Sequence, residues 1–205
     1  MTLPILYHCA DARSLRCLWA AEEAQFPVDL KVLPFPPRFL APEYKAVNPL
    51  ATVPAWIEDG MMLTESAAIC QRIAAGTALE LVPKDVDYLP YLNWLHRSDA
   101  TLTFPLAIMI RYTRVEQGER RLAQAVEDYK LFFLGRAKSI ETALSDGRDY
   151  LVAGRFTIAD ICVGYALFLA TTLGIADELG DHCQAHLKRL TAREAFLRAR
   201  VRQSV

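Results

Sequence analysis

The chain has 205 residues, which is enough for one large domain or two small ones with a substantial hydrophobic core. Hydrophobic residues make up 53% and charged residues 23%, and this balance excludes a disordered chain or a fibrous repeat. The 23 basic and 24 acidic residues give a net charge of −1, which argues against a nucleic-acid-binding protein because such proteins present a basic surface to phosphate.

The sequence carries no signal of membrane insertion or export. No uninterrupted apolar run approaches the roughly 18 residues of a membrane span. The first residues lack a basic segment, and Asp11 interrupts the place where a signal core would run, so we expect no secretion. The five cysteines have no CxxC spacing and no histidine at metal-ligand spacing, which predicts a reduced, cytoplasmic protein without zinc or a disulfide framework.

The first 77 residues predict a small open sheet with helices packed on it. The hydrophobic patterns alternate between the periods of strands and helices, and Asp59-Gly60 predicts a tight turn between two strands. A cluster of prolines after the second strand argues against regular structure there. The expected strands are 4–7, 28–33, 53–57 and 61–63, and the expected helices are 12–24 and 67–75.

From residue 88 onward the sequence predicts helices only. Long helical patterns cover 88–114 and 119–145, with a kink expected at Pro105, and another helix begins at Thr157, which has the spacing of a capping box with Asp160. With 77–87 as a linker, we expect an α/β domain at 1–77 and an all-α domain at 88–205. The arginines at the chain's end, 198, 200 and 202, predict a solvated tail.

The dipeptide Val53-Pro54 stands at the start of a predicted strand, where a proline cannot donate to the ladder. A cis peptide bond there would leave the N–H and C=O of Val53 free to pair with a peptide-like ligand as with an added strand. The alternative is an ordinary trans proline at an edge strand.

Glu65-Ser66 lies where a strand ends and a helix begins. The serine hydroxyl and the exposed N–H groups of a helix start can hold a carboxylate, and Glu65 can hold an ammonium. Together these groups suit the α-amino-acid end of a ligand. The alternative is a simple helix cap by Thr64 or Ser66.

Three segments resemble the cytosolic glutathione transferases, and together they cover nearly the whole chain. NPLATVPA at 48–55 and LTESAAI at 63–69 look like the glutathione-binding signature, and LVAGRFTIAD at 151–160 resembles the family's helix-start motif. RSLR at 13–16, followed by Trp19, and the segment from Trp94 to Ala100 look like a bacterial and fungal branch. The resemblance implies a thioredoxin-like domain followed by an all-helical domain, which is the glutathione transferase fold.

The resemblance also implies how the co-substrate glutathione would be held, without a metal. Pro54 should be cis, Val53 should pair with the cysteinyl backbone, and Glu65 and Ser66 should hold the γ-glutamyl end. Many relatives reach the glycine carboxylate with Lys or Gln where this chain has Thr52, which is shorter, so Arg38 is our hypothesis for that contact. In a homodimer, Asp99 of the partner would complete the γ-glutamyl site, unless Asp99 is a helix-surface charge.

The thiol of glutathione needs a donor or a cation near the start of the first helix, because a free thiol is mostly protonated at pH 7. Where serine-type relatives carry their activating serine, an ungapped alignment places Asp11, whose charge would oppose a thiolate, and we interpret Asp11 as the helix N-cap. Ser14 is then the first choice for activation. Arg13, Tyr7 and a mixed disulfide through Cys9 stay open as alternatives.

The electrophile site is expected between the domains and beside the kinked helix. Its expected lining is Leu102, Phe104, Met109 and Tyr112, although such a stripe is more often part of a core than of a pocket. We therefore expect a cytoplasmic, homodimeric glutathione transferase that conjugates small hydrophobic electrophiles. The alternatives are a glutathione-dependent thiol-disulfide or peroxide reductase that uses Cys9, and a non-catalytic glutathione-binding module of the same fold.

Overall fold

The computed structural model describes residues 2–204, and the chain divides into two compact units. The first unit contains the residues up to Glu80 together with those from Ala192 onward, and the second unit contains Leu81–Thr191. Within the described chain, no helix is both long and apolar enough to cross a bilayer.

A four-stranded mixed sheet forms the centre of the first unit, in the order β2-β1-β3-β4. Its strands are β1 (Ile5–His8), β2 (Asp29–Val32), β3 (Ala55–Glu58) and β4 (Met61–Leu63). β1 and β2 are parallel, whereas β1–β3 and β3–β4 are antiparallel. The turn between β3 and β4 has positive φ at both Asp59 and Gly60, as the Asp-Gly pair predicts for a two-residue hairpin turn.

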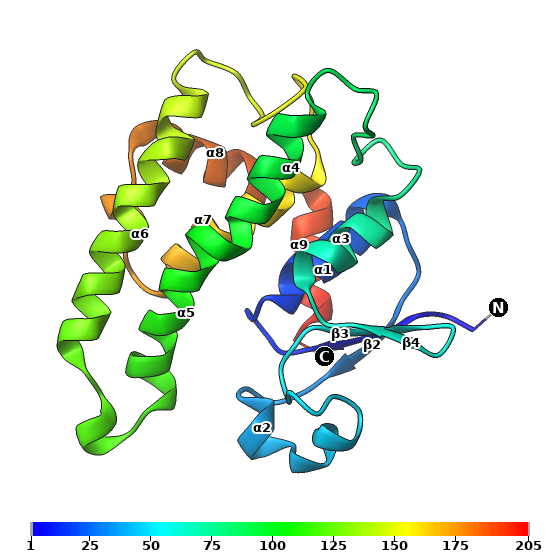
Figure 1. Ribbon diagram of the computed structural model, residues 1–205, viewed down its shortest axis with the longest axis vertical. Coiled ribbons are helices and arrows are strands. Elements are labelled where there is room, and N and C mark those ends of the chain that lie inside the picture. The colour runs from blue at the N-terminus through cyan, green and yellow to red at the C-terminus, as the bar shows by residue number, and fades with distance from the viewer. Residues whose placement is uncertain (1, 205) are drawn as a thin grey trace. The chain divides into compact units, whose positions relative to one another are not determined.

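The helices of the first unit come from both ends of the chain. They are α1 (Ser14–Ala24), α2 (Pro37–Leu40), the 3-10 turn η1 (Pro42–Ala46), α3 (Ser66–Ala74) and α9 (Glu194–Arg202). α1 packs against α3 on one side and against α9 on the other (Figure 1). Short helical turns thus replace the irregular stretch expected after β2, because Pro37 and Pro42 occupy first-turn positions, where the missing N–H costs nothing.

The place of α9 corrects the expected domain boundary. Residues from 192 onward, which were expected in the second domain, pack on the first unit, where Phe196 meets the buried Trp19 ring at a centroid distance of 4.9 Å. The expected solvated tail is also wrong. Arg198 and Arg202 both form ion pairs with Glu22 of α1, because α1 presents acidic side chains to the arginine-rich helix.

The second unit is helical throughout its regular structure. Its elements are α4 (Tyr88–Arg97), the π-helical segment η2 (Ser98–Thr103), α5 (Phe104–Ile110), the π-helical segment η3 (Arg111–Val115), the 3-10 turn η4 (Gly118–Arg120), α6 (Ala123–Leu144), α7 (Ile158–Thr172), the 3-10 turn η5 (Ala176–Glu178) and α8 (Asp181–Thr191). α7 is buried along most of its length and forms the core of this unit.

Two local predictions in the second unit can be read directly from the backbone. A kink was expected at Pro105, and the structure has the π-helical segment η2 just before it, because a proline in the first turn of α5 removes an N–H from the preceding helical ladder. The capping box is confirmed: the Thr157 hydroxyl accepts from the N–H of Ala159, and Asp160 accepts from the N–H of Thr157.

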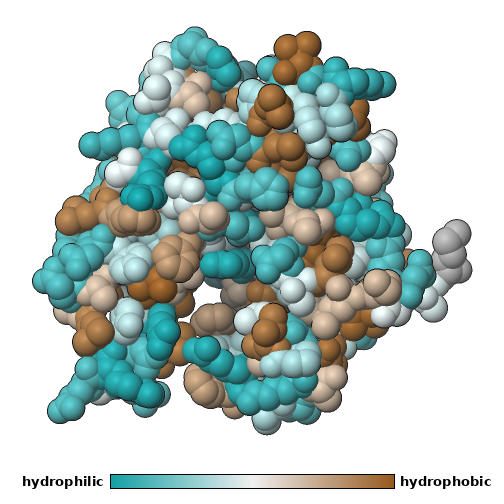
Figure 2. Space-filling model, viewed as in Figure 1, coloured by the Kyte–Doolittle hydropathy of each residue, from teal (hydrophilic) through white to brown (hydrophobic). Residues whose placement is uncertain are grey.

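The outer strand of the first unit's sheet is unusually apolar for an edge. All three residues of β4 are exposed, with Met61 at 74%, Met62 at 41% and Leu63 at 38%. Figure 2 shows hydrophobic side chains at the surface in this region of the first unit. An exposed apolar edge strand is a site for association with another protein surface.

Candidate functional site

The sheet topology of the first unit brings the predicted glutathione-binding segments to one edge. By this edge we mean the side of the sheet where the strands β1, β2 and β4 end and where β3 begins. β3 begins there because it runs antiparallel to the other three strands. Continuing the β1–β3 register from Tyr7–Ala55 places Val53 opposite Cys9. Continuing the β3–β4 register from Trp56–Leu63 places Pro54 opposite Glu65.

The Val53–Pro54 peptide bond is cis, which confirms the prediction from the family resemblance. Val53 is partly buried, and its backbone N–H and C=O have no hydrogen-bond partner within residues 2–204. Ala55, one residue beyond the proline, enters β3. The chain therefore offers an unpaired donor and acceptor beside the ordered sheet, as an added strand requires.

A buried amide that the sequence analysis missed fixes the turn before Val53. The side chain of Asn48, which is 1% exposed, donates to the Thr52 carbonyl at 2.9 Å and accepts from the Leu50 N–H at 3.1 Å. Tyr44 donates to the same Thr52 carbonyl at 2.9 Å. The Thr52 side chain is exposed at this turn. Asparagine's tendency to bond the backbone two residues ahead could have indicated this turn from the sequence.

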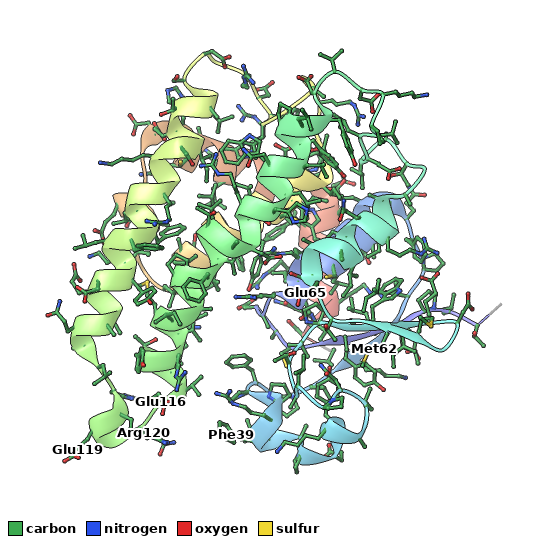
Figure 3. The ribbon with its side chains drawn as sticks, viewed as in Figure 1. Phe39, Met62, Glu65, Glu116, Glu119 and Arg120 are labelled. Carbon is green, nitrogen blue, oxygen red and sulfur yellow. The ribbon has the colours of Figure 1, made fainter. Side chains whose placement is uncertain are left out.

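Glu65 and Ser66 stand at the start of α3, as predicted. Glu65 occupies the N-cap position, its side chain is exposed, and its carboxylate has no partner in the described part of the chain. Ser66 is 3% exposed and begins the helix. Figure 3 shows Glu65 at the end of α3 nearest the strands, and Met62 on β4 just before it. A free carboxylate can hold the ammonium of a ligand, and the helix N-terminus beside it can hold the carboxylate of the same ligand.

The loop from Cys9 to Arg13, between β1 and α1, is closed by Ser14. The Ser14 hydroxyl accepts from the Cys9 N–H at 3.2 Å and lies 3.4 Å from the Cys9 carbonyl, and the side chain is fully buried. Ser14 thus has a structural role in this loop, and its role in activating a thiol stays a prediction. Arg13 is the N-cap residue of α1 and is partly exposed.

The interpretation of Asp11 as the N-cap of α1 is wrong. Asp11 has a φ of 57°, in the left-handed region, and the cap position belongs to Arg13. The Asp11 side chain instead turns toward α9, where Gln203 donates to it at 2.8 Å and Arg200 forms an ion pair with it. Residues 192 positions apart in the sequence thus meet at the loop where thiol chemistry is expected.

The remaining predicted residues of the first unit are less constrained. Arg38 is exposed on α2, with its guanidinium 4.9 Å from the ring centre of Phe39, which Figure 3 labels. α2 follows the carboxyl end of β2, so Arg38 belongs to the same edge of the sheet. Tyr7 packs against the Tyr44 ring at a centroid distance of 5.1 Å.

The predicted residues of the second unit do not behave as one group. Leu102 and Met109 are buried, at 0% and 3% exposure, and belong to the core of that unit, whereas Phe104 is 44% exposed. Tyr112 is partly buried, and Asp99 lies in η2 and is also partly buried. The roles of these residues in holding an electrophile or glutathione stay predictions.

The cysteines are placed as small hydrophobic residues. All five are buried as free thiols, and burial raises the pKa of the Cys9 thiol to about 12. The Cys9 sulfur lies 3.6 Å from the Pro34 carbonyl. A thiol so protected is almost entirely protonated at pH 7, and it is therefore a poor nucleophile. Across the described residues, no three His, Cys, Asp or Glu side chains gather as a metal site would require.

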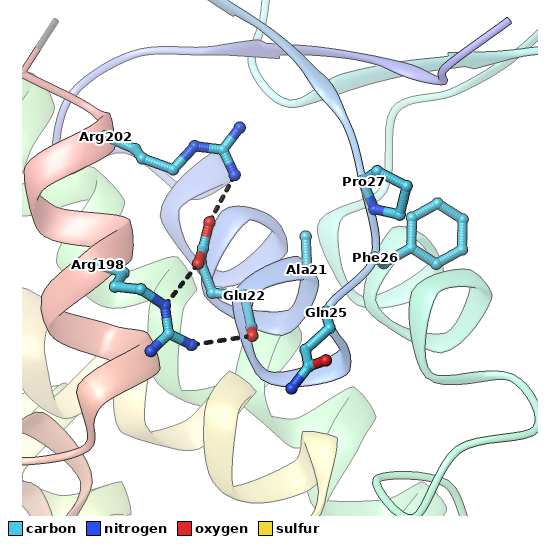
Figure 4. Close-up of a pocket in the computed structure, with 7 residues that line it drawn as sticks. All are labelled: Ala21, Glu22, Gln25, Phe26, Pro27, Arg198 and Arg202. Atoms are coloured by element: carbon cyan, nitrogen blue, oxygen red, sulfur yellow. Dashed lines mark hydrogen bonds and ion pairs between the residues drawn. The ribbon is translucent and has the colours of Figure 1, made fainter.

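A polar pocket of about 420 Å³ lies at the opposite end of α1 (Figure 4). Glu22 lines this pocket, and its carboxylate accepts hydrogen bonds from Arg198 at 2.9 Å and from Arg202 at 2.5 Å. Partial burial alone would raise the pKa of Glu22, but the hydrogen bonds and charges of Arg202 and Arg198 together outweigh it and hold that pKa below its usual value. Both arginines of this pocket are already paired with Glu22, so the sheet edge, where the Glu65 carboxylate has no partner in the described part of the chain, is the better site for a ligand.

Comparisons with known proteins agree with this architecture. Residues 12–75 match the model of the glutathione S-transferase N-terminal domain. Glutathione S-transferase 3 of Schizosaccharomyces pombe is 31% identical over 101 residues, which are 48% of this chain and 42% of that protein. The match therefore spans less than half the length of this curated relative.

Solved structures resemble the whole chain at lower identity. BphK, a bacterial glutathione transferase solved as a ternary complex, has a TM-score of 0.85 at 22% identity, covering 98% of this chain and 100% of that chain. The nitrogen regulation fragment of the yeast prion protein Ure2p has a TM-score of 0.83 at 22% identity, covering 97% and 96%. A thioredoxin-like unit followed by a helical unit thus defines the glutathione transferase fold here. The chain therefore has the glutathione transferase fold, and residues 12–75 match the N-terminal domain of that family.

Proposed function

We propose that the chain is a glutathione transferase that conjugates the thiolate of glutathione to small hydrophobic electrophiles. The observation that carries the proposal is the unpaired backbone of Val53, beside the cis bond to Pro54, with the unpaired carboxylate of Glu65 across the sheet register. One edge of the first unit thereby offers backbone groups for strand-like hydrogen bonding and a carboxylate for an ammonium group to the same tripeptide.

Each part of glutathione has a proposed partner at this edge. Val53 pairs with the cysteinyl backbone, Glu65 holds the γ-glutamyl ammonium, and Ser66 with the start of α3 holds its carboxylate. Arg38 reaches the glycine carboxylate, near the exposed Thr52. In a homodimer, Asp99 of the partner completes the γ-glutamyl site.

The proposed chemistry begins when the thiol proton passes to solvent. The thiolate sulfur then attacks an electrophilic carbon and forms a C–S bond, while the bond from that carbon to its leaving group, such as a halide, breaks and the leaving group departs with the electron pair. Each pKa unit by which the thiol is depressed requires about 1.4 kcal/mol. The N-terminus of α1 supplies up to about 2 kcal/mol, and a hydroxyl donor supplies about 1.5 to 3 kcal/mol. Arg13 and Ser14 stand at that terminus, and Ser14 could donate by releasing its long contact to the Cys9 carbonyl.

A reductase that uses Cys9 is the less favoured alternative, because its thiol is buried and has a raised pKa. A non-catalytic module has a specific observation in its favour. Ure2p, of which one solved fragment is named for nitrogen regulation and another structure contains glutathione, matches this fold as well as the transferases do. In that case the chain would bind glutathione without turnover.

The other functional expectations are proposals of the same kind. The apolar residues of β4 supply a surface for a homodimer, and their exposure supports it. The electrophile would bind near Phe104 and Tyr112 of the second unit, with Leu102 and Met109 behind them in the core. We propose a cytoplasmic location and a detoxifying role.

Titration with glutathione in a calorimeter tests the binding site. Glu65→Gln is expected to weaken glutathione binding about tenfold or more, because a charge-assisted hydrogen bond is lost. Asp59→Asn is the matched control, since Asp59 is an exposed acidic residue in the β3–β4 turn, at the opposite edge of the sheet. Equal affinities of the Glu65 variant and the wild type would contradict the site.

Turnover of an aryl halide separates the transferase from the binding module. The transferase proposal expects release of halide and a glutathione conjugate from the wild-type protein. Glutathione binding that depends on Glu65, without turnover of any of several electrophiles, would favour the module instead.

A further inference from the structure

Hydrogen bonds and an ion pair join the C-terminal end of α9 to the loop between β1 and α1. The Asp11 N–H donates to the Gln203 side-chain oxygen at 3.1 Å, and the Gln203 amide donates back to the Asp11 carboxylate at 2.8 Å. Gln203 is 3% exposed and the Asp11 side chain is 36% exposed, so the pair is shielded from water on the Gln203 side only. Arg200, one turn earlier, forms an ion pair with the same carboxylate oxygen.

These contacts hold a backbone conformation that the loop would otherwise leave readily. Asp11 has a φ of 57°, which costs a non-glycine residue free energy unless neighbouring groups fix it. On the other side of the loop, Ser14 binds the Cys9 N–H, and the Ala12 N–H bonds the Cys9 carbonyl at 3.1 Å. The loop is therefore fixed from α1 and from α9 together.

The same contacts alter the charge at the start of α1. An unbalanced Asp11 carboxylate near a thiolate would raise the thiol pKa by repulsion. Arg200 balances the charge of Asp11. The other charged or titratable groups near the start of α1 are Arg13, at its N-cap, and His8, which is buried near Gln203 and Ser14. The negative residue that stands where an activating serine was expected is thus matched by a cation from the far end of the chain.

We propose that Arg200 and Gln203 are positioning residues for thiolate formation, Arg200 by balancing the charge of Asp11 and Gln203 by fixing the loop that presents the start of α1. This inference rests on the proposed function, since it explains how a glutathione thiolate can form at the proposed site despite the negative charge of Asp11.

The other end of α9 supplies a matched control. Arg193 pairs with Glu23 through two hydrogen bonds, of 2.6 and 2.9 Å. Glu23 lies near the last turn of α1, roughly 15 Å along the helix from Arg13 at 1.5 Å per residue. Arg193→Gln therefore loosens α9 from α1 without touching the loop.

The charge part is tested by the ultraviolet absorbance of bound thiolate against pH. Arg200→Gln is expected to raise the apparent thiol pKa by about one unit, because Asp11 becomes unbalanced. Asp11→Asn should lower it, because Arg200 then acts alone, and the double variant should return to the wild-type titration. Arg200→Lys should stay near the wild type. Arg193→Gln should lower the melting temperature without moving the titration.

The positioning part is tested by steady-state kinetics. Gln203→Leu is expected to lower kcat severalfold while KM for glutathione stays within about twofold, because Val53 and Glu65 still hold the tripeptide. A rise in KM with unchanged kcat would overturn this role.

The outcomes also separate this inference from the proposed function. A wild-type thiolate signal with an unmoved titration in both Arg200→Gln and Asp11→Asn overturns only the inference, as does an equal shift in Arg193→Gln. If Arg200→Gln does not fold, Asp11→Asn alone decides by the sign of its shift. A wild-type protein that binds no thiolate overturns the proposed function and this inference with it.

Discussion

Acid should destabilise the first unit through one buried histidine. His8 ends β1 and is fully buried, and neither ring nitrogen has a hydrogen-bond partner within residues 2–204. Burial lowers its pKa from 6.5 to about 4, against smaller opposing effects of the nearby Gln203 side chain and Ser14 backbone. The unfolded chain therefore binds a proton between pH 6.5 and 4 that the folded unit does not bind, so stability falls as the pH falls through this window.

The size of the effect follows from the two pKa values. At about 1.36 kcal/mol per unit, the full shift corresponds to about 3.4 kcal/mol, of which about 2.5 kcal/mol should be lost between pH 7.5 and pH 4.5. His8→Gln removes the titrating group, so its stability should fall less over the same interval. The difference between the two proteins isolates His8 from the other groups that titrate in acid.

Urea unfolding at the two pH values measures this difference. In a Trp94→Phe background, fluorescence reports the first unit alone, because Trp19 and Trp56 lie there and Trp94 lies in the second unit. His96→Gln, at an exposed position on α4, serves as the control. An equal loss of stability on acidification in the wild type and in His8→Gln would refute the assignment of this acid sensitivity to His8.

Three further predictions concern other buried groups. Thr157→Ala should cost the second unit about 1 to 2 kcal/mol in thermal or urea unfolding through loss of the helix cap, whereas Thr142→Ala on α6 should cost less than about 0.5 kcal/mol. Asn48→Ala should destabilise the first unit by about 1 to 3 kcal/mol and weaken glutathione binding, since two backbone groups before Val53 lose their partner; unchanged calorimetric affinity would contradict this link. Cys9 should resist alkylation at pH 7 until the protein unfolds, and rapid modification of the folded protein, read by mass spectrometry, would contradict its burial.

Much of the fold could be predicted because its signals are local. The Asp59-Gly60 turn, the helix expected at 67–75 and the capping box at Thr157 depend on residues within a few positions of one another, and the structure agrees with each. The cis bond before Pro54 was different, since the residues alone favoured a trans proline and only the family resemblance predicted the cis geometry that the structure has.

The errors came from contacts between distant parts of the chain. α9 joins the first unit through pairs such as Arg193 with Glu23, 170 residues apart, which no periodic pattern reveals. The opposite charges of α1 and α9 were a usable signal, but a run of arginines at a chain end was interpreted as solvated. Asp11 was placed wrongly for the same reason, because its partner Gln203 lies far along the sequence.

The return of α9 has a consequence for biosynthesis. Trp19 of α1 packs against Phe196, so the first unit is assembled from segments that lie far apart in the sequence. As the ribosome releases the chain from its amino end, the sheet, α1 and α3 emerge early, but an apolar flank of α1 stays uncovered until translation has passed residue 196. A nascent chain halted before that point would expose this flank to chaperones and proteases.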